Sequence, residues 1–321
     1  MRRVAAPLAA ALAALLIGAC GDGGAEPGAS KEATLVLDFQ PNAVHAGIYA
    51  ALGRGYYSDR GIDLTVREPS ASTDSPKLLA AGRAQFAILD IHDVGLARES
   101  GADVVGIASI VGRPLAALIA RDRNAVRAPA DLDGGTVGVT GLPSDDAVLD
   151  SVLEAGGADP DAVDRVTIGF ESVTALSSSR LDAATAFWNA EGVTLRRLGV
   201  PTREFRVDDY GAPRYPELVL ATSAETLERD PELAQSMVAA TERGLEVAAR
   251  SPGAALAELL RAVPTLERGE QRAQLAALEG AGAFDAAGPL KRSVLRRWAA
   301  WDLEHGILSR PLEVGSAFAT P

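Results

Sequence analysis

Short runs rich in β-branched and apolar residues alternate with helical stretches from Thr34 onward. Strands that alternate with helices in this way are typical of sheets covered by helices, so the pattern predicts an α/β fold. The predicted strands span residues 34–38, 62–66, 85–89, 104–111, 115–120, 136–140, 165–169, 183–187, 203–207 and 218–222.

Beyond the last predicted strand the chain reads as almost wholly helical. A helix is predicted over 231–249, because Asp230 can cap its free amides, a proline suits its first turn and its apolar residues fall on one face. A second helix is predicted over 290–305, where Trp298 and Trp301 lie three positions apart. We expect both tryptophans to be core residues without a ligand role.

The order of these elements predicts two lobes, the first of which is discontinuous. A chain of 321 residues suits about two domains at roughly 150 residues each. The apolar stretch over 104–120 is interrupted at Gly112-Arg113-Pro114, where the backbone can turn from one lobe to the other. The predicted divisions are 33–117 for the first part of lobe 1, 118–219 for lobe 2 and 220–321 for the helical return of lobe 1, with two hinge crossings.

The first residues predict export. Arg2 and Arg3 precede an apolar run over 4–17, which indicates a secretory leader. Ile17-Gly18-Ala19-Cys20 resembles a bacterial lipobox, so residues 1–19 are predicted to be a lipoprotein signal peptide and Cys20 the lipidated residue; the alternative is an unmodified cysteine near a cut made elsewhere. The Gly- and Ser-rich residues 20–32 suit a flexible tether, and the body would lie outside the cytoplasm, anchored to the bacterial cell membrane.

Charge and motifs exclude several classes of function. With 31 basic and 43 acidic residues the net charge is −12, which disfavours nucleic acid as a partner. The three histidines have no metal-ligand spacing, and the chain contains no nucleotide-binding loop and no GxSxG elbow. We therefore expect no metal, no cofactor and no enzymatic activity, and we interpret the chain as a binding protein that closes on a small solute.

Several segments resemble one family. They are LDFQPNAVHAGIY at 37–49, GRGYYSDRGIDL at 53–64, LAAGRAQFAI at 79–88, IASIV at 107–111 with Arg113-Pro114, and FWNAEG at 187–192. Together they are similar to the ThiY-type binding proteins for thiamine pyrimidine precursors. This resemblance implies a two-lobed periplasmic binding protein of type II, an aminopyrimidine ligand of the hydroxymethyl or formylaminomethyl type, and an ABC permease with its ATPase as partners.

The same superfamily contains pyrimidine synthases, which use a pyridoxal phosphate lysine and a sacrificed histidine. His45 falls where that histidine would lie. However, no cysteine follows Cys20 and no lysine lies between Asp38 and His45, so the iron-binding stretch and the lysine of those synthases are missing here. The resemblance to the synthases therefore does not predict an enzyme.

A flat aminopyrimidine needs aromatic side chains against its faces and amide or carboxylate groups at its edge. Several candidates follow directly after predicted strands, where ligands bind in open α/β sheets. The predicted ligand-binding residues are Phe39, Trp188 and Tyr210 for stacking, Asn42, Asp90, Asn189 and Glu191 for the edge, and His45 and Arg113 from the family segments.

Structural roles compete with these assignments. Phe39 could pack at a lobe edge, His45 could lie on a helix face, and Asp90 could cap the next helix. Glu191 could be an acid that favours a helix N-terminus. Asp145, at the start of a helix, would repel a phosphate, which disfavours phosphorylated pyrimidines and sulfonates as ligands.

Two other functions remain open at this point. One is a binding protein for another flat heterocycle such as riboflavin, which would need a wider cleft. The other is an extracytoplasmic enzyme, for which Asp90 with His92 is the only suggestive acid–base pair.

Overall fold

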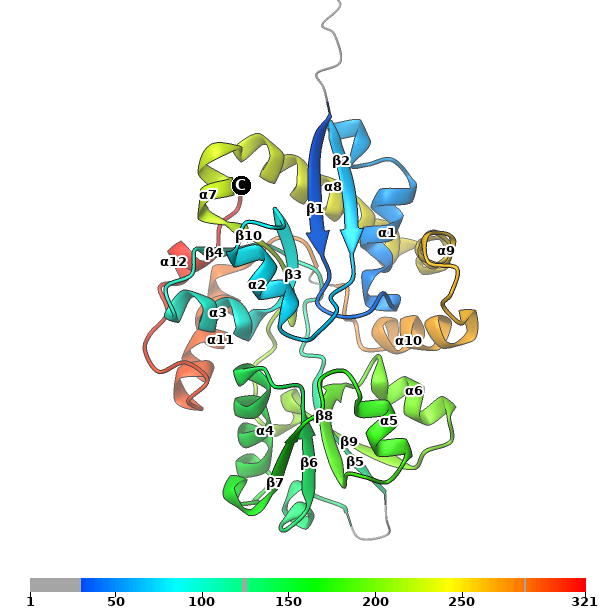
Figure 1. Cartoon of the computed structure of the whole chain (residues 1–321), viewed down its shortest axis with the longest axis vertical. Helices are drawn as coiled ribbons and strands as arrows, with labels where there is room; N and C mark the ends of the chain where they lie inside the picture. The colour runs from blue at the N-terminus through cyan, green and yellow to red at the C-terminus, as the bar shows by residue number, and fades with distance from the viewer. Residues whose placement is uncertain (1–29, 123–125, 286) are drawn as a thin grey trace, which may run out of the picture.

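Two separate mixed sheets organise the chain into two lobes (Figure 1). The computed structural model describes residues 30–122, 126–285 and 287–321. The predicted signal peptide, Cys20 and most of the predicted tether lie outside the described residues. Lys31 and Glu32, which the sequence placed in the tether, already belong to the first strand.

The sheet of lobe 1 has the strand order β2-β1-β3-β10-β4. Strand β1 is parallel to β2 and β3, whereas β10 runs antiparallel to β3 and β4. Strand β10, which comes late in the sequence, thus lies inside this sheet between β3 and β4. The strands are β1 (Lys31–Val36), β2 (Ile62–Arg67), β3 (Phe86–Asp90), β4 (Val104–Ser109) and β10 (Leu218–Ser223).

The sheet of lobe 2 has the order β7-β6-β8-β5-β9, with β6 parallel to β7 and β8, and β5 antiparallel to β8 and β9. Its strands are β5 (Ala116–Arg121), β6 (Thr136–Val139), β7 (Asp164–Thr167), β8 (Ala183–Phe187) and β9 (Thr202–Arg206). Every strand predicted from the sequence overlaps an observed one, and the predicted fold class, two lobes with mixed sheets and two crossings, is confirmed.

Helices cover both sheets, and the return of the chain after β10 adds several of them to lobe 1 (Figure 1). Lobe 1 contains η1 (Ala43–His45), α1 (Ala46–Gly53), η2 (Ser58–Arg60), α2 (Asp74–Ala80), α3 (Ile91–Glu99), α7 (Ala224–Arg229), α8 (Pro231–Arg250), α9 (Pro252–Ala262), α10 (Arg268–Gly280), α11 (Arg292–Glu304) and α12 (Val314–Ala317). Lobe 2 contains η3 (Pro129–Leu132), α4 (Pro143–Ala155), η4 (Pro160–Ala162), α5 (Ser172–Ser177), α6 (Glu191–Arg197) and η5 (Val207–Tyr210).

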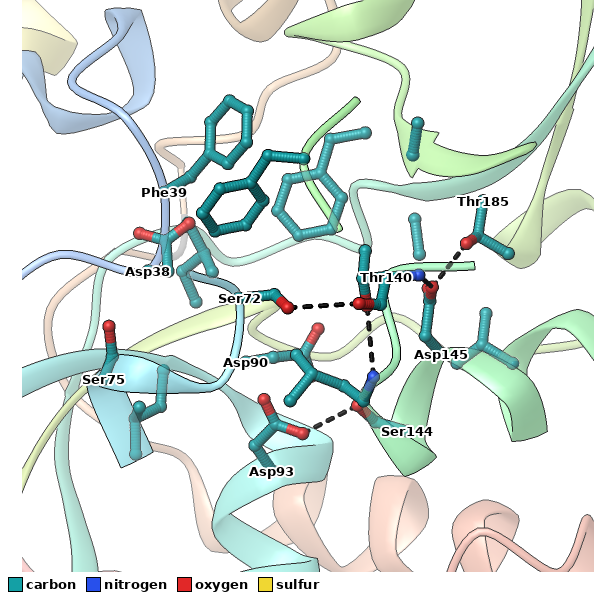
Figure 2. Close-up of a pocket in the computed structure, with 18 of the residues that line it drawn as sticks. Asp38, Phe39, Ser72, Ser75, Asp90, Asp93, Thr140, Ser144, Asp145 and Thr185 are labelled. Carbon is teal, nitrogen blue, oxygen red and sulfur yellow. Dashed lines mark hydrogen bonds between the residues drawn. The ribbon is translucent and has the colours of Figure 1, made fainter. Parts of the chain in front are cut away.

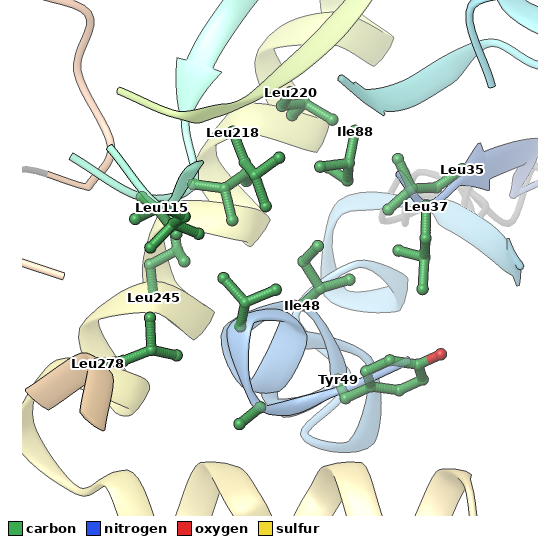
Figure 3. Close-up of a cluster of buried hydrophobic side chains, with 14 of the residues drawn as sticks. Leu35, Leu37, Ile48, Tyr49, Ile88, Leu115, Leu218, Leu220, Leu245 and Leu278 are labelled. Carbon is green, nitrogen blue, oxygen red and sulfur yellow. The ribbon is translucent and has the colours of Figure 1, made fainter. Parts of the chain in front are cut away.

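Helix α8 begins as the sequence predicted, since the Asp230 carboxylate accepts a hydrogen bond from the Leu233 amide over 3.1 Å. Its buried face packs on α1 at two glycines. A Cβ on Gly244 would lie 2.1 Å from the carbonyl oxygen of Gly47, so the two helices touch backbone to backbone. Figure 3 shows Leu245 of α8 close to Ile48 of α1 in the main apolar cluster.

The two tryptophans of α11 are core residues, as predicted. Trp298 and Trp301 are buried in the second apolar cluster, together with Leu89 and Val94 of lobe 1 and Tyr215 from the second crossing. This cluster supports the start of α3, whose first turn faces lobe 2.

The chain crosses between the lobes after β4 and again before β10, and Glu217 ties the two crossings together. Its fully buried carboxylate accepts hydrogen bonds from the amides of Leu115 and Ala116, the latter over 3.1 Å. Arg113 ties the first crossing to both lobes, because it pairs with Asp208 over 2.9 Å and donates to the Ala281 carbonyl over 3.0 Å.

Candidate ligand-binding site

A pocket lies between the two lobes, at the ends of strands from both sheets (Figure 2). Strands β3 and β8 both end at its wall, as expected for a ligand site in open α/β sheets. Lobe 1 contributes Asp38, Phe39, Ser72, Ser75, Asp90 and Asp93, and lobe 2 contributes Thr140, Ser144, Asp145, Phe170, Thr185, Phe187 and Glu191.

Phenyl rings from both lobes form the apolar part of the pocket. Phe39 of lobe 1 meets Phe170 of lobe 2 edge to face, with ring centroids 4.6 Å apart and planes at 90°. Phe187 adds a third ring at the end of β8. Rings arranged in this way offer flat surfaces against which a planar heterocycle can stack.

The polar part of the lining is acidic, and none of the described lining residues is Lys, Arg or His. His45 holds Asp38 in place. The backbone N–H of Asn42 donates to Nδ1 of His45 over 3.2 Å, so the ring proton of this histidine is on Nε2. This Nε2 atom lies 2.8 Å from the Asp38 carboxylate. Such a lining repels anions and suits a ligand that offers amino or ring N–H donors.

Asp145 and Glu191 are anchored by one carboxylate oxygen each. Oδ2 of Asp145 accepts from the Thr140 amide over 2.7 Å and from the Thr185 hydroxyl over 2.5 Å. Oε2 of Glu191 accepts from the Phe187 amide over 3.1 Å. Burial raises the pKa of Asp145, and burial raises the pKa of Glu191 to about 7, so Glu191 exchanges a proton near neutral pH.

Asp90 connects the pocket to a buried polar cluster at the hinge. The ligating atoms of Asp90, His92 and Glu217 lie within 4.8 Å of one another, a spacing that would suit a cation. However, the nitrogens of His92 contact Asp302 over 2.8 Å and Tyr215 over 3.0 Å, so this histidine is already committed to hydrogen bonds. Two carboxyl groups remain, which fits a shared proton better than a metal ion.

The pKa shifts agree with a shared proton. Burial and the nearby Glu217 carboxylate raise the pKa of Asp90 well above its usual range, and burial raises the pKa of Glu217 to about 7. Burial opposes protonation of His92, but the Asp302 and Asp90 carboxylates outweigh it and raise its pKa to about 9. These directions agree with one proton shared between Asp90 and Glu217 and with positive charge on His92 beside Asp302.

The structure brings three of the predicted ligand-binding residues into this pocket: Phe39, Asp90 and Glu191. Asp90 also caps α3, because its carboxylate accepts from the His92 amide over 2.8 Å, so both roles considered for it coexist. Direct contact of the three side chains with a ligand stays a prediction.

Asn42 and His45 lie behind the pocket. Both are buried in lobe 1, and Oδ1 of Asn42 accepts from the Val44 amide over 3.0 Å to cap η1. Their side chains are occupied by these local bonds, so they shape the loop that presents Asp38 and Phe39.

Trp188 is fully buried at the hinge and does not line the pocket. Its indole N–H donates to the Pro114 carbonyl over 3.1 Å, and the Arg206 guanidinium lies 4.2 Å from its ring centroid. Consecutive side chains at the end of a strand point to opposite sides, so Phe187 faces the pocket and Trp188 faces away.

The remaining predicted residues also lie elsewhere. Arg113 holds the hinge through Asp208, and half-buried Tyr210 packs edge to face on Phe205 with ring centroids 6.0 Å apart. Asn189 is fully buried, and neither atom of its amide has a hydrogen-bond partner among the described residues.

Sequence reasoning missed several lining residues. Phe170 follows β7 and Phe187 ends β8, so the strand-end rule that selected Phe39 could have found them. Asp93 was not among the predicted ligand-binding residues. No local signal marks Asp38 as a lining residue, because His45 orients it through a contact that forms only in the folded loop.

The profile of the NMT1/THI5-like family matches residues 42–255. The chain belongs to this family. A formylaminopyrimidine-binding protein from Halalkalibacterium halodurans is 34% identical over 251 residues, which cover 78% of this chain and 76% of that protein. A 4-amino-5-hydroxymethyl-2-methylpyrimidine phosphate synthase from Legionella pneumophila is 27% identical over 236 residues, 73% of this chain and 74% of the synthase. The chain is thus similar both to a protein named as a binding protein and to one named as a synthase.

Among solved structures, the alkanesulfonate-binding protein SsuA from Xanthomonas axonopodis pv. citri, bound to MOPS, superposes with a TM-score of 0.73 at 15% identity, covering 91% of this chain and 99% of that one. This likeness confirms the periplasmic binding protein fold. No helix among the described residues is both long and apolar enough to cross a membrane.

Proposed function

We propose that this chain is the extracytoplasmic binding lipoprotein of an ABC importer and that its pocket takes up an aminopyrimidine of the thiamine-precursor type. The observation that carries the proposal is the lining itself: phenyl rings from both lobes combined with carboxylates and without a basic side chain among the described lining residues.

The charge of the lining supports this class of ligand. An aminopyrimidine offers two faces for Phe39 and Phe170 and an edge with an exocyclic amine that donates to carboxylates. Glu191, with a pKa of about 7, suits such an edge because a carboxyl group can either accept from the amine or donate to a ring nitrogen. A phosphate or sulfonate would meet Asp38 and Asp145 instead and be repelled.

A role in binding rather than turnover is also part of the proposal. His92, the one base suggested from the sequence, is fully buried and directs its nitrogens to Asp302 and Tyr215. A general base must reach the proton that it removes, and His92 lies behind Asp90 instead. We therefore propose that the chain releases its ligand unchanged to a permease.

The lipid anchor is proposed on Cys20, with residues 20–30 as the tether. Lys31 starts β1 at the end of lobe 1 that points away from lobe 2 (Figure 1). An anchor attached there leaves the mouth between the lobes free. Mass spectrometry of the membrane fraction would test this, since a lipidated N-terminus should be present in the natural chain and lost in Cys20→Ser.

Calorimetric titration tests the ligand class. We expect saturable, one-to-one binding of hydroxymethylpyrimidine or formylaminopyrimidine, weaker or no binding of riboflavin, and none of an alkanesulfonate or the pyrimidine phosphate. Chromatography after the titration should return the pyrimidine unchanged. Binding of the phosphate in preference to the alcohol would refute the proposal, and conversion of the ligand would refute its non-enzymatic part.

A further inference from the structure

Two hydrogen bonds join the lobes directly along the wall of the pocket (Figure 2). The hydroxyl of Ser144 on α4 donates to Oδ1 of Asp93 on α3 over 2.7 Å. The hydroxyl of Ser72, also in lobe 1, donates to the Thr140 carbonyl of lobe 2 over 3.1 Å. All four residues line the pocket, so separating the lobes to release a ligand breaks both bonds.

The Asp93–Ser144 hydrogen bond is the stronger of the two. A hydroxyl that donates to a carboxylate forms a charge-assisted bond, which is stronger than one to a neutral carbonyl. Asp93 lies in the first turn of α3, and its partner lies in the first turn of α4. Negative charge is favoured at both places, because the N-termini of helices carry partial positive charge.

Both partners of this contact are shielded from solvent. Asp93 is 9% exposed and Ser144 4% exposed. Among the described residues, the bond to Ser144 is the hydrogen bond that Asp93 makes, and no Lys or Arg pairs with it. Burial raises the pKa of Asp93 to about 6, although the Ser144 bond lowers it, so the carboxylate is held in a place that it would otherwise avoid.

Contacts on the outer side of the lobes differ. Helices α6 and α10 meet through Thr194 and Glu270, 2.5 Å apart, and through an ion pair of 2.8 Å between Arg197 and Glu267. None of these residues lines the pocket, and exposed ion pairs such as the latter contribute little. These contacts join the lobes away from the pocket, so they do not position its wall against a ligand.

We infer that the Asp93–Ser144 bond is a latch that forms when lobe 2 closes on lobe 1 and that sets how long the ligand stays bound. The inference rests on the proposed function of the pocket. Asp93 is a positioning residue here: it holds α4, with Asp145 on the same turn, against the ligand. Because the latch exists only while the lobes are closed, it slows their reopening and the release of the ligand, and it leaves the encounter of ligand and open cleft unchanged.

Stopped-flow kinetics with hydroxymethylpyrimidine test the latch. Ser144→Ala and Asp93→Ala should each raise the dissociation rate about tenfold without slowing association, since one charge-assisted bond is lost. The double variant should be no faster than either single one, because both remove the same bond. Asp93→Asn keeps an acceptor oxygen and should lie between the natural protein and Asp93→Ala.

Ser151→Ala is the matched control, because this buried serine lies on the same helix and its hydroxyl donates to the Val148 carbonyl within lobe 2. It should bind and release like the natural protein. Unchanged dissociation in Ser144→Ala, or additive effects in the double variant, would overturn the latch.

If the natural protein binds no heterocycle, the proposed function fails, and solution scattering of the ligand-free proteins then decides the latch alone. A larger radius of gyration in Ser144→Ala than in the natural protein and in Ser151→Ala supports it. Equal radii in all three overturn it.

Discussion

The hinge and the pocket wall both contain buried carboxyl groups, but the protein uses them in different ways. At the hinge, Glu217 accepts from two amides of the opposite crossing, and Asp302 pairs with His92. On the pocket wall, Asp145 and Glu191 also accept hydrogen bonds from their own lobe, but both residues line the pocket, whereas Glu217 and Asp302 do not. The hinge acids thus bind structural partners away from the pocket, whereas the wall acids border the space proposed for the ligand.

Removing the hinge carboxylate should have the largest effect. Glu217→Ala leaves the buried amides of Leu115 and Ala116 without an acceptor, and we expect the free energy of unfolding to fall by about 3 kcal/mol. Urea denaturation measures the loss. Glu217→Gln keeps an oxygen for these amides and should lose less; equal stability of Glu217→Ala and the natural protein would contradict the structural role.

Removing the carboxylate of Glu191 from the pocket wall should lower the affinity for the ligand rather than the stability of the protein. Glu191→Gln is expected to weaken binding of hydroxymethylpyrimidine by roughly 10–100-fold, the cost of one hydrogen bond to a charged group. The thermal midpoint should change little, because the glutamine keeps an oxygen that can accept from the Phe187 amide. Exposed Glu246 on α8 provides the control Glu246→Gln. Calorimetry that finds equal affinities for the two variants would place Glu191 outside the site.

Stability should depend on pH through buried acids with raised pKa values, namely Glu217 at the hinge and Glu191 and Asp93 on the pocket wall. The folded pKa of about 7 for Glu217 lies above the ordinary value of 4.5, so the folded state holds a proton that the unfolded chain has released. This stabilisation is complete below pH 4.5 and is lost as the pH rises through 7. His92 acts in the same direction, since its stabilisation is lost as the pH rises from 6.5 through 9.

Stability should therefore decrease from pH 5 to pH 8, by up to about 1.4 kcal/mol per pH unit for each proton that the folded state holds in excess. Asp230 caps a helix, and its hydrogen bond to Lys31 lowers its pKa. Protonation of Asp230 below pH 4 should therefore remove its contribution to stability, so that stability falls again in strong acid. Urea denaturation at several pH values measures the slope. Glu217→Gln should have a shallower slope, and a steeper one would show that another group titrates.

The strands and the hinge crossings could be predicted from local sequence patterns, namely apolar and β-branched runs and the interruption at Gly112-Arg113-Pro114. Side-chain direction at the strand ends could not. Phe187 and Trp188 are neighbours with similar chemistry, and the sequence favoured the larger ring as the ligand contact, yet the end of β8 turns it to Pro114 and Arg206. Asp38 depends likewise on His45, whose ring is oriented by the Asn42 amide. The directions of these side chains depend on tertiary contacts, which cannot be read from the spacing of residues in the sequence.

Phe170, the ring that the sequence reasoning missed, offers a sharper test of the wall. Phe170→Ala removes one side of the ring pair with Phe39 and should weaken pyrimidine binding by about tenfold, since aromatic pairs contribute on the order of 1 kcal/mol beyond their buried area. Phe170→Tyr keeps the ring and should retain most of the affinity. Calorimetric titration decides, and full affinity in Phe170→Ala would show that the ligand stacks elsewhere.

Substitution of Trp188, which lies at the hinge, should have the smallest effect on stability and almost none on ligand affinity. Trp188→Phe loses the bond to Pro114 and part of the contact with Arg206, so we expect about 1 kcal/mol less stability and an affinity within about twofold of the natural protein. Trp301→Phe is the matched control, because the N–H of this buried indole has no partner among the described residues and its loss removes only packing. If Trp188→Phe instead weakened binding tenfold at unchanged stability, the indole would have to reach the ligand, and the division between a structural hinge and a ligand-binding wall would fail at this residue.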